Sequence, residues 1–416
     1  MARKRADGEG TIYEQKQRNR WAGEFPYKDQ NGKTHKKTFI GKTQKEVARK
    51  GKEFLKNIEA GLLPEADKIT VGEWLERWLM DYVKPNVSIN SYEKYSTDLK
   101  NYVIPKLGGE KLIKLQSPTV QRLFNDMLDH GRTKPRQSVA GKGLSSSIVR
   151  TTRRYFTMAI DKAVELGMVS KNVVKQTKPP KLIKREISPL SEEQASILLE
   201  TAKKGGYMPK EYYTYHQTYE REYTNSLAYA VLLIALNTGM RRGEVLGLRW
   251  EDIDFKANKV NVKRSLVVSK VQGTIFQETK TKGSVRNILV TADVMKELRH
   301  YKKVQEWFKN LMGDKYEDST GIVFTTTFGK PVNGCSFVSR TYKRILAAAG
   351  ISDQFTFHDL RHTHATMLLR RGVNIKVIAE RLGHSNISMT LDTYSHLMPD
   401  MQHVAVDTLD KIFKKA

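Results

Sequence analysis

Cysteine is almost absent from this sequence of 416 residues, which contains only Cys335. An intramolecular disulfide is therefore impossible, and a disulfide-stapled scaffold is excluded. This composition is expected of a protein that works in the reducing cytoplasm. The amino terminus, MARKRADGEG, lacks an apolar stretch and predicts no signal peptide. The longest apolar run, around residues 227–236, is far too short to cross a bilayer, so no membrane partner is expected.

Acidic residues are also scarce relative to basic ones. The chain has 45 Asp and Glu against 72 Lys and Arg, which gives a formal net charge of +27. A charge of this sign and size predicts a polyanionic partner. The excess could instead serve solubility, but acidic residues would do so at least as well. We therefore expect a nucleic-acid partner, and the length predicts two or three domains.

The first 62 residues predict a small β-sheet followed by a helix. Apolar residues alternate with more polar ones over 21–27, which is the period of a half-buried strand. The Asn-Gly pair at 31–32 predicts a turn into a second strand over 34–40, and a short strand near 11–13 completes the sheet.

A helix then opens at the capping-box pair Thr43 and Glu46. The basic residues that crowd the predicted sheet are Arg18, Arg20, Lys36 and Lys37. They form either a solvated basic face or, as the net charge favours, a surface that contacts DNA from a sheet lying in the major groove.

Residues 70–178 show helical patterns throughout. Thr70 and Glu73 form a second capping box, a serine followed by proline at 117–118 predicts another helix start, and a long helix starts near Ser145. An apolar stripe runs along this long helix, with three arginines off the stripe: Arg150, Arg153 and Arg154. They could form a solvated face, but the net charge favours contacts with DNA phosphates.

Residues 179–189 combine prolines with basic residues and predict an extended linker. The third domain would then span 190–416. Within it, residues 203–224 contain six tyrosines and interrupt two helical patterns. Whether this segment packs on the surface or touches DNA stays open.

Arg241 stands in TGMRRGE, just after an apolar helix that Gly239 is placed to cap. An arginine at the start of the next short helix lies close to backbone N–H groups that favour an anion. Pairing with Glu244 at the surface is the alternative, and Arg242 has the same chemistry.

Farther on, Lys280 occupies a predicted hairpin tip between strands at 274–278 and 285–290. Such a lysine can donate a proton if neighbouring cations lower its pKa, and Lys282 is the alternative.

His358 and Arg361 stand three residues apart in HDLRHTHAT, so their side chains point to one place on a helix. That arrangement suits two groups that contact one phosphate. His358 and His362 also have the spacing of helical zinc ligands, but Asp359 replaces the glutamate of an HExxH motif, and no metal site is expected.

The last motifs are LGHS, which contains His384, and LDTYSHL, which contains Tyr394. A tyrosine alone is more often structural than nucleophilic. The complete set and its order resemble the tyrosine recombinase (phage-type integrase) family, with a layout closest to the integrases of conjugative transposons. The residues that carry the resemblance are Arg241, Lys280, His358, Arg361, His384 and Tyr394.

The resemblance implies a multidomain fold class. Residues 1–62 would be an arm-site DNA-binding domain of a small β-sheet plus helix, and residues 70–178 an all-α core-binding domain. The linker at 179–189 would lead to a catalytic domain at 190–416, mainly α (α+β) with a small antiparallel β-sheet.

The resemblance also implies that this enzyme cuts and rejoins DNA through a 3′-phosphotyrosyl intermediate on Tyr394, without a cofactor or metal ion. It implies double-stranded DNA with core and arm sites, a homo-tetramer on DNA, an excision factor and DNA-bending proteins as partners, and a mobile element as host. The apolar carboxyl-terminal tail would dock on a neighbouring subunit or pack on its own domain. The alternatives are a type IB topoisomerase-like enzyme and a non-catalytic DNA-binding protein.

Overall fold

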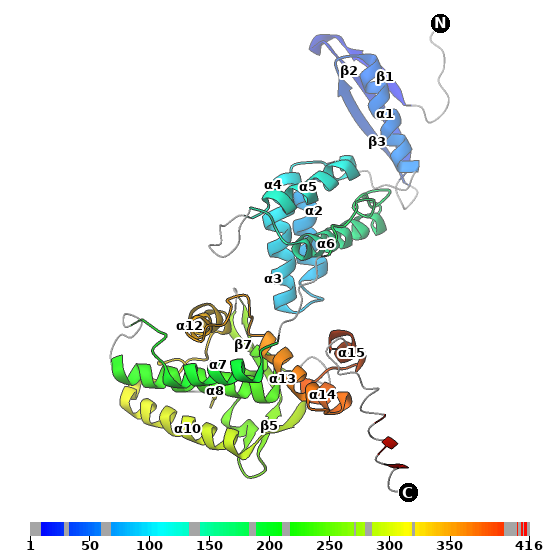
Figure 1. The fold of residues 1–416 in the computed structure, drawn as a ribbon. Helices are drawn as coiled ribbons and strands as arrows, with labels where there is room; N and C mark the ends of the chain where they lie inside the picture. Colours follow the sequence, from blue (N-terminus) through cyan, green and yellow to red (C-terminus); the bar gives the residue numbers. More distant parts are fainter. Residues whose placement is uncertain are drawn as a thin grey trace. The chain divides into compact units, whose positions relative to one another are not determined.

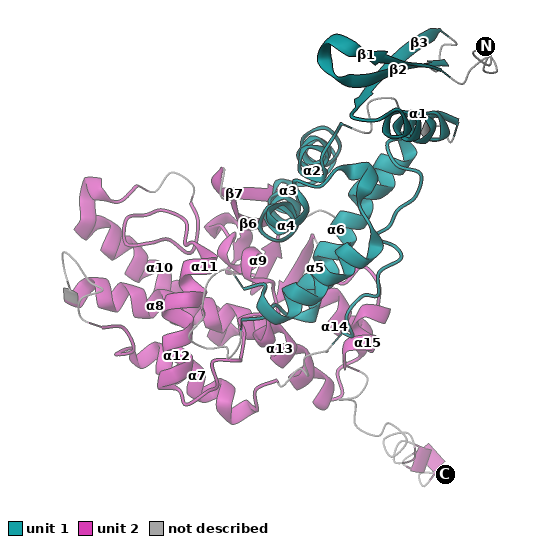
Figure 2. Cartoon of the chain, turned by 90° about the horizontal axis from the view of Figure 1, so that it is seen from above, with its two compact units in different colours: residues 1–184 teal, residues 185–416 magenta. Residues whose placement is uncertain are grey.

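The chain forms two compact units, Met1–Lys184 and Arg185–Ala416 (Figure 2). It is mainly helical, with small antiparallel sheets, as predicted (Figure 1). No described helix is both long and apolar enough to cross a membrane. The structure, a computed structural model, describes residues 10–28, 33–59, 68–132, 142–182, 189–209, 217–269, 272–278, 285–317 and 321–394, and the single positions 406, 409, 410, 412 and 413.

The first unit begins with the predicted sheet and helix. Strands β1 (Thr11–Gln15), β2 (Arg20–Lys28) and β3 (Thr34–Gly41) form an antiparallel sheet in that order, followed by helix α1 (Gln44–Glu59). Gly51 of α1 lies on the ring of Phe25, and a Cβ added there would fall 1.9 Å from that ring. A glycine is therefore required at this contact between the helix and the sheet.

Because side chains alternate along a strand, the basic residues of this sheet lie on both of its faces. Lys37 pairs in register with the buried Phe25, on the face that α1 covers, and its ammonium lies 5.6 Å from the centre of the Phe54 ring. Lys36 is exposed on the other face and lies 3.5 Å from Glu24. Arg20 donates to the side chain of Gln15 at 2.8 Å. A DNA-contact role for these residues and for Arg18 stays a prediction.

The helical part of the first unit has one apolar core, and the indole of Trp74 donates to the carbonyl of Ala159 across it. The capping box of Thr70 and Glu73 is confirmed, with both of its hydrogen bonds present. The predicted helix start at 117–118 is confirmed, with the proline in the first turn, but the capping residue is Gln116 rather than the serine at 117. The helices are α2 (Val71–Trp78), α3 (Ile89–Asp98), α4 (Ile104–Leu107), α5 (Ser117–His130) and α6 (Ser146–Glu165), with π-helical turns η2 (Leu79–Val83) and η3 (Leu99–Val103).

Two of the three arginines of α6 bind the protein itself. The guanidinium of Arg153 donates to Thr177 Oγ1 at 2.9 Å and to the Thr177 carbonyl at 2.8 Å, with further contacts to the carbonyls of Val174 and Lys175. Arg150 donates to the carbonyl of Pro180 at 2.8 Å. Arg154, like Arg150, is exposed and therefore accessible to a phosphate. Their DNA contacts stay predictions.

The second unit is built around helix α8 (Gln217–Thr238), against which α7 (Glu192–Lys204), α10 (Ala292–Met312) and α13 (Asp359–Arg370) pack. The other helices are α9 (Arg242–Leu246), α11 (Gly334–Ser336), η9 (Phe337–Tyr342), α12 (Lys343–Ala348), α14 (Ile375–Leu382) and α15 (Ser388–Tyr394). Figure 1 shows α13, α14 and α15 following one another at one end of the unit.

The strands of this unit are present where predicted, but their pairing differs from the expected hairpin. One sheet has the order β4 (Ile253–Asp254), β5 (Lys259–Val262), β8 (Arg286–Leu289), and the other pairs β6 (Arg264–Ser269) with β7 (Gly273–Glu278). In the described pairing β7 and β8 are in different sheets, so the predicted β7–β8 hairpin is wrong. Strand period reveals which residues face the core, but it does not reveal the partner strand.

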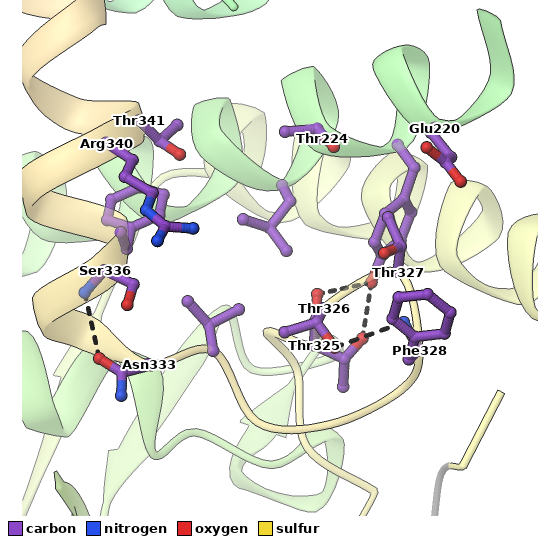
Figure 3. A pocket seen from close by; sticks show the side chains of 14 residues that line it. Glu220, Thr224, Thr325, Thr326, Thr327, Phe328, Asn333, Ser336, Arg340 and Thr341 are labelled. Atoms are coloured by element: carbon purple, nitrogen blue, oxygen red, sulfur yellow. Dashed lines mark hydrogen bonds between the residues drawn. The ribbon is translucent and has the colours of Figure 1, made fainter. Parts of the chain in front are cut away.

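Part of the tyrosine-rich segment belongs to the core. Tyr223 is 1% exposed, stacks on Phe308 with ring centres 4.5 Å apart, and shares a hydrogen bond with the Thr325 hydroxyl at 2.6 Å. A cavity of about 390 Å³ lies beside this contact, and Figure 3 shows the side chains of Glu220 and Arg340 on its rim. None of the five candidate catalytic residues that the structure describes lines this cavity.

Candidate active site

Arg241 is positioned by the break between two helices. Helix α8 ends at Thr238 and is followed by Gly239, whose φ of +64° suits glycine, and Arg241 directly precedes α9. Its backbone N–H and its Nη1 each donate to the carboxylate of Glu244 at 2.9 Å. The side chain of Arg241 is 40% exposed, so it remains accessible from solvent. Arg242 instead points toward Cys335, with 3.9 Å between its Nη2 and the sulfur.

Glu244 is a buried carboxylate between two arginines. Arg286 of β8 donates to it at 2.7 Å from Nη2, and the Nε of Arg286 donates to the carbonyl of Arg381 at 2.7 Å. Burial alone would raise the pKa of Glu244. The hydrogen bond and charge of Arg286, with those of Arg241, outweigh burial and lower that pKa below its ordinary value. Glu244 therefore stays ionised and holds both guanidiniums in place.

Arg361 extends from α13 into the interior and is 3% exposed. Its Nη1 donates to the carbonyl of Gly239 at 2.8 Å. Its Nη2 is buried and has no hydrogen-bond partner within the described ranges. Burial, with the nearby charge of Arg241, lowers the pKa of Arg361 to about 9, so the group is still cationic at neutral pH. A buried cationic donor without an acceptor is costly, and an incoming anion would relieve that cost.

His358 and His384 are both held neutral. Burial and the charge of Arg361 lower the pKa of His358 below its ordinary value. Burial, with the charges of Arg361 and Arg241, lowers the pKa of His384 to about 4. His384 follows the end of α14, and its Nδ1 lies 2.7 Å from the hydroxyl of Thr390. At neutral pH both rings can take part in hydrogen bonds, but they add no positive charge.

Tyr394 ends helix α15 and is 1% exposed. It packs in an apolar cluster with Leu369 of α13 and Ile378 of α14. Its hydroxyl lies 2.6 Å from Nδ1 of His362. Burial raises the pKa of Tyr394 to about 12, although the charge of Arg361 opposes the shift. The phenol is therefore protonated at neutral pH.

The structure gathers five of the six predicted residues into one region, where each either shifts the pKa of another or has its own pKa shifted by one of them: Arg241, His358, Arg361, His384 and Tyr394. Lys280 and its alternative Lys282 lie outside the described residues. Arg286 and His362 also belong to this region, and the sequence did not predict a role there for either. No local pattern marks Arg286, while His362 was considered only as a metal ligand.

Among the residues that the structure describes, no three His, Cys, Asp or Glu side chains gather to hold a metal ion. The site is instead dominated by arginines around one buried carboxylate. Such a donor set suits an anion with several oxygen atoms, and phosphate is one of the anions whose geometry matches paired guanidinium donors.

Two family models match this sequence. The model described as the phage integrase family matches residues 187–401, and the model of the phage integrase N-terminal SAM-like domain matches residues 70–128. Among curated proteins, the chain is 31% identical over 403 residues to "Tyrosine recombinase XerC-like" of Caldanaerobacter subterraneus subsp. tengcongensis. That alignment covers 93% of this chain and 94% of the relative.

Solved structures share the fold at lower identity. The Tn1549 transposon integrase in complex with transposon right end DNA is 20% identical, with a TM-score of 0.63, and the match covers 82% of this chain and 99% of that one. A lambda integrase tetramer bound to a Holliday junction is 17% identical, with a TM-score of 0.52, and the match covers 95% of this chain and 97% of that one.

Proposed function

The chain belongs to the phage integrase family of tyrosine recombinases, enzymes that cleave and rejoin DNA, and from this premise we propose that it integrates and excises a mobile genetic element. It does so at specific sites, through a covalent bond between Tyr394 and the 3′ phosphate of the cut strand. The observation that carries the proposal is the buried Nη2 of Arg361, a cationic donor that has no acceptor among the residues the structure describes. It lies near the charge of Arg241 and the phenol of Tyr394. A DNA phosphate supplies the missing acceptor.

Each residue of the proposed set has one task. Arg241 and Arg361 bind the non-bridging oxygens of the phosphate, and loss of one such stabiliser lowers the rate by about 10²–10³-fold. Tyr394 attacks phosphorus, and Lys280 protonates the departing 5′ oxygen. His358 and His384 assist as hydrogen-bonding or acid/base groups. The covalent intermediate conserves the bond energy, so religation needs no ATP. The cations take the place of a metal ion.

The proposal includes a homo-tetramer on double-stranded DNA, because recombination exchanges strands between two duplexes. The lambda integrase of similar fold is a tetramer on a Holliday junction, which supports this assembly. Leu409, Ile412 and Phe413 are each more than half exposed, at 52%, 58% and 71%, and suit docking on a neighbouring subunit. Packing of this tail on its own unit is the alternative. A chain truncated after Pro399 that still assembles normally on DNA would contradict the docking.

The proposal also assigns a separate function to each part of the chain. Residues 1–62 bind arm sites through the sheet, residues 70–178 bind the core site, and residues 190–416 catalyse, after a linker at 179–189. An excision factor and DNA-bending proteins then set the direction of recombination. The transposon integrase of similar fold, which is bound to transposon DNA, supports a mobile element as the host of this gene.

The test uses the full chain with DNA that flanks its gene. We expect a covalent protein–DNA adduct on a nicked suicide substrate with the wild type and with Tyr342→Phe, a buried tyrosine outside the proposed set. Tyr394→Phe should form none while it still binds DNA. An adduct that persists in Tyr394→Phe rejects the assignment of the nucleophile. Abolition of wild-type cleavage by EDTA would indicate a metal-dependent nuclease.

A further inference from the structure

The hydroxyl of Tyr394 is bound by a histidine that is not in the proposed catalytic set. Its Oη lies 2.6 Å from Nδ1 of His362, and the two ring centres are 5.6 Å apart. Tyr394 is 1% exposed, so bulk water does not compete for this contact. Within the ranges that the structure describes, His362 is the hydrogen-bond partner of this hydroxyl.

Both members of the pair lie among packed residues. His362 follows Arg361 on α13 and lies one turn after His358, with the two imidazole rings edge to face at 5.0 Å. The next residue, Thr363, accepts the backbone N–H of Leu190 at 3.0 Å, which fixes this turn of α13 to the start of the unit. The position of the His362 side of the contact is therefore fixed by the fold, as catalysis by a positioned group requires.

The chemistry of the two groups determines where the proton lies. Burial raises the pKa of Tyr394 to about 12, so the phenol must transfer its proton to a base before or as it attacks phosphorus. A neutral imidazole nitrogen is a far stronger base than a phenol oxygen. The phenol therefore donates the hydrogen bond, and Nδ1 accepts it in the tautomer that carries its proton on Nε2.

We propose that His362 is a catalytic residue, the general base that takes the proton of Tyr394 during attack on DNA. This inference rests on the proposed function above. The O–H bond of Tyr394 breaks and its proton moves to Nδ1 of His362. The phenol oxygen forms the bond to phosphorus, and the bond from phosphorus to the 5′ oxygen breaks. That oxygen keeps the electron pair and takes a proton from the leaving-group acid, assigned above to Lys280. In religation His362 returns its proton to Tyr394.

The other imidazoles of the site are less suited to this task. Nδ1 of His384 is engaged with Thr390, and its pKa of about 4 makes it a weak base. The pKa of His358 is also lowered, by burial and by Arg361. One rival explanation uses the same contact: His362 could restrain Tyr394 in a resting position. A base and a restraint predict opposite effects of substitution, because loss of the base slows cleavage and loss of the restraint accelerates it.

The experiment measures the rate of adduct formation by the full chain on a nicked duplex, built around the cleavage position mapped with the wild type. In His362→Asn, an amide oxygen replaces Nδ1 and keeps the hydrogen bond but cannot accept the proton. We expect the rate to fall about 10²-fold or more, with unchanged DNA affinity and melting temperature. His362→Ala should be equally slow and should recover part of its rate when imidazole is added. His300→Asn, at an exposed position on α10, is the matched control and should react at the wild-type rate.

A second substrate distinguishes a role of His362 as general base from a role as general acid. With sulfur in place of the bridging 5′ oxygen, the leaving group needs no proton, so a defect in the acid disappears whereas the His362 defect should persist. An unchanged or faster rate in His362→Asn, or a normal rate on the sulfur substrate, overturns the inference. Failure of the proposed function gives a different result: the wild type forms no adduct, or Tyr394→Phe still forms one.

Discussion

Nη2 of Arg286 lies 2.7 Å from Oε2 of Glu244, although the two residues are 42 positions apart in the sequence. Both side chains are almost fully buried, with exposures of 7% and 4%. Glu244 also holds Arg241, so one carboxylate joins strand β8 to the start of α9. A buried ion pair is strongly destabilised when one partner alone is removed, because the other charge is left uncompensated.

Glu244→Gln should therefore lower the free energy of unfolding by about 3 kcal/mol. It should also slow adduct formation, because Arg241 loses the partner that orients it. Denaturant unfolding and the suicide-substrate assay measure the two effects. The matched control is Glu251→Gln, since Glu251 is 60% exposed and pairs with Arg264 at 3.1 Å. That change should alter stability by about 1 kcal/mol or less. Equal losses in both variants would contradict the importance of burial.

Gly239→Ala should disturb the site through its backbone. A Cβ there would lie 2.6 Å from the ring of His364 and 2.7 Å from the side chain of Leu382, at a φ of +64°. The resulting shift would move the carbonyl that holds Arg361. We expect a stability loss of about 2–4 kcal/mol, from left-handed strain plus overpacking, and at least a roughly tenfold slower cleavage.

Gly350→Ala separates the effect of left-handed backbone strain from the effect of overpacking. Gly350 has a similar φ of +67°, but nothing lies within 4 Å of an added Cβ. This variant should lose only about 1–2 kcal/mol from backbone strain and retain wild-type cleavage. Similar losses of activity in Gly239→Ala and Gly350→Ala would show that crowding at the site is not the cause.

His364 should make stability depend on pH. It is 5% exposed, its Nδ1 contacts the carbonyl of Leu236 at 2.7 Å, and burial lowers its pKa from 6.5 to about 4. Between those values the unfolded chain binds the proton and the folded chain does not. The stability that the neutral ring maintains is therefore fully present above pH 6.5 and is lost as the pH falls toward 4.

The loss associated with His364 should be on the order of 3 kcal/mol across this window. Denaturation at a series of pH values measures it, and His364→Asn, which keeps a donor for the Leu236 carbonyl, should flatten the slope. The exposed His300→Asn should leave the slope as in the wild type. An unchanged slope in His364→Asn would assign the acid sensitivity to other groups.

Arg153 and Arg154 are adjacent in sequence but should respond differently to substitution. Arg153→Ala removes the contacts to Thr177 and its neighbours, so the first unit should lose about 2 kcal/mol or more of stability. Arg154→Ala should leave stability within about 0.5 kcal/mol of the wild type, because Arg154 is exposed.

If the proposed DNA contact of Arg154 is correct, its removal should weaken binding to all sequences and reduce the salt dependence of log affinity by about one unit of slope. Fluorescence anisotropy at several salt concentrations measures that slope. A stable Arg153→Ala with a reduced salt slope would instead assign the phosphate contact to Arg153.

Local features of this fold could be predicted because their causes are local. The capping box of Thr70 and Glu73 needs only residues three positions apart, and the strands of the first sheet follow from their alternation and turn residues. The motifs around Arg241, His358, Arg361, His384 and Tyr394 could also be located, because each lies at a helix boundary that its neighbours specify. Their catalytic roles remain a proposal.

Other contacts could not be predicted because they join distant positions. Strands at the positions of β7 and β8 were predicted, but not their partner strands. Helical spacing placed Arg150, Arg153 and Arg154 off the apolar stripe without showing that Thr177 folds back onto Arg153. The period of a helix or strand determines the face on which a side chain lies, whereas the residue that it contacts in space depends on how whole elements pack.

The sequence by itself determined the net charge, the approximate location of the helices and strands along the chain, and the sequence motifs that contain the candidate reactive side chains. Composition and short-range period are sufficient for these. Only the tertiary structure decided that Glu244 joins Arg241 to Arg286, and that His362 rather than His384 contacts the Tyr394 hydroxyl. The physical reason is that hydrogen bonds and ion pairs form over about 3 Å. Packing of α13 against α14 and α15, and of β8 near α9, brings these groups within that distance.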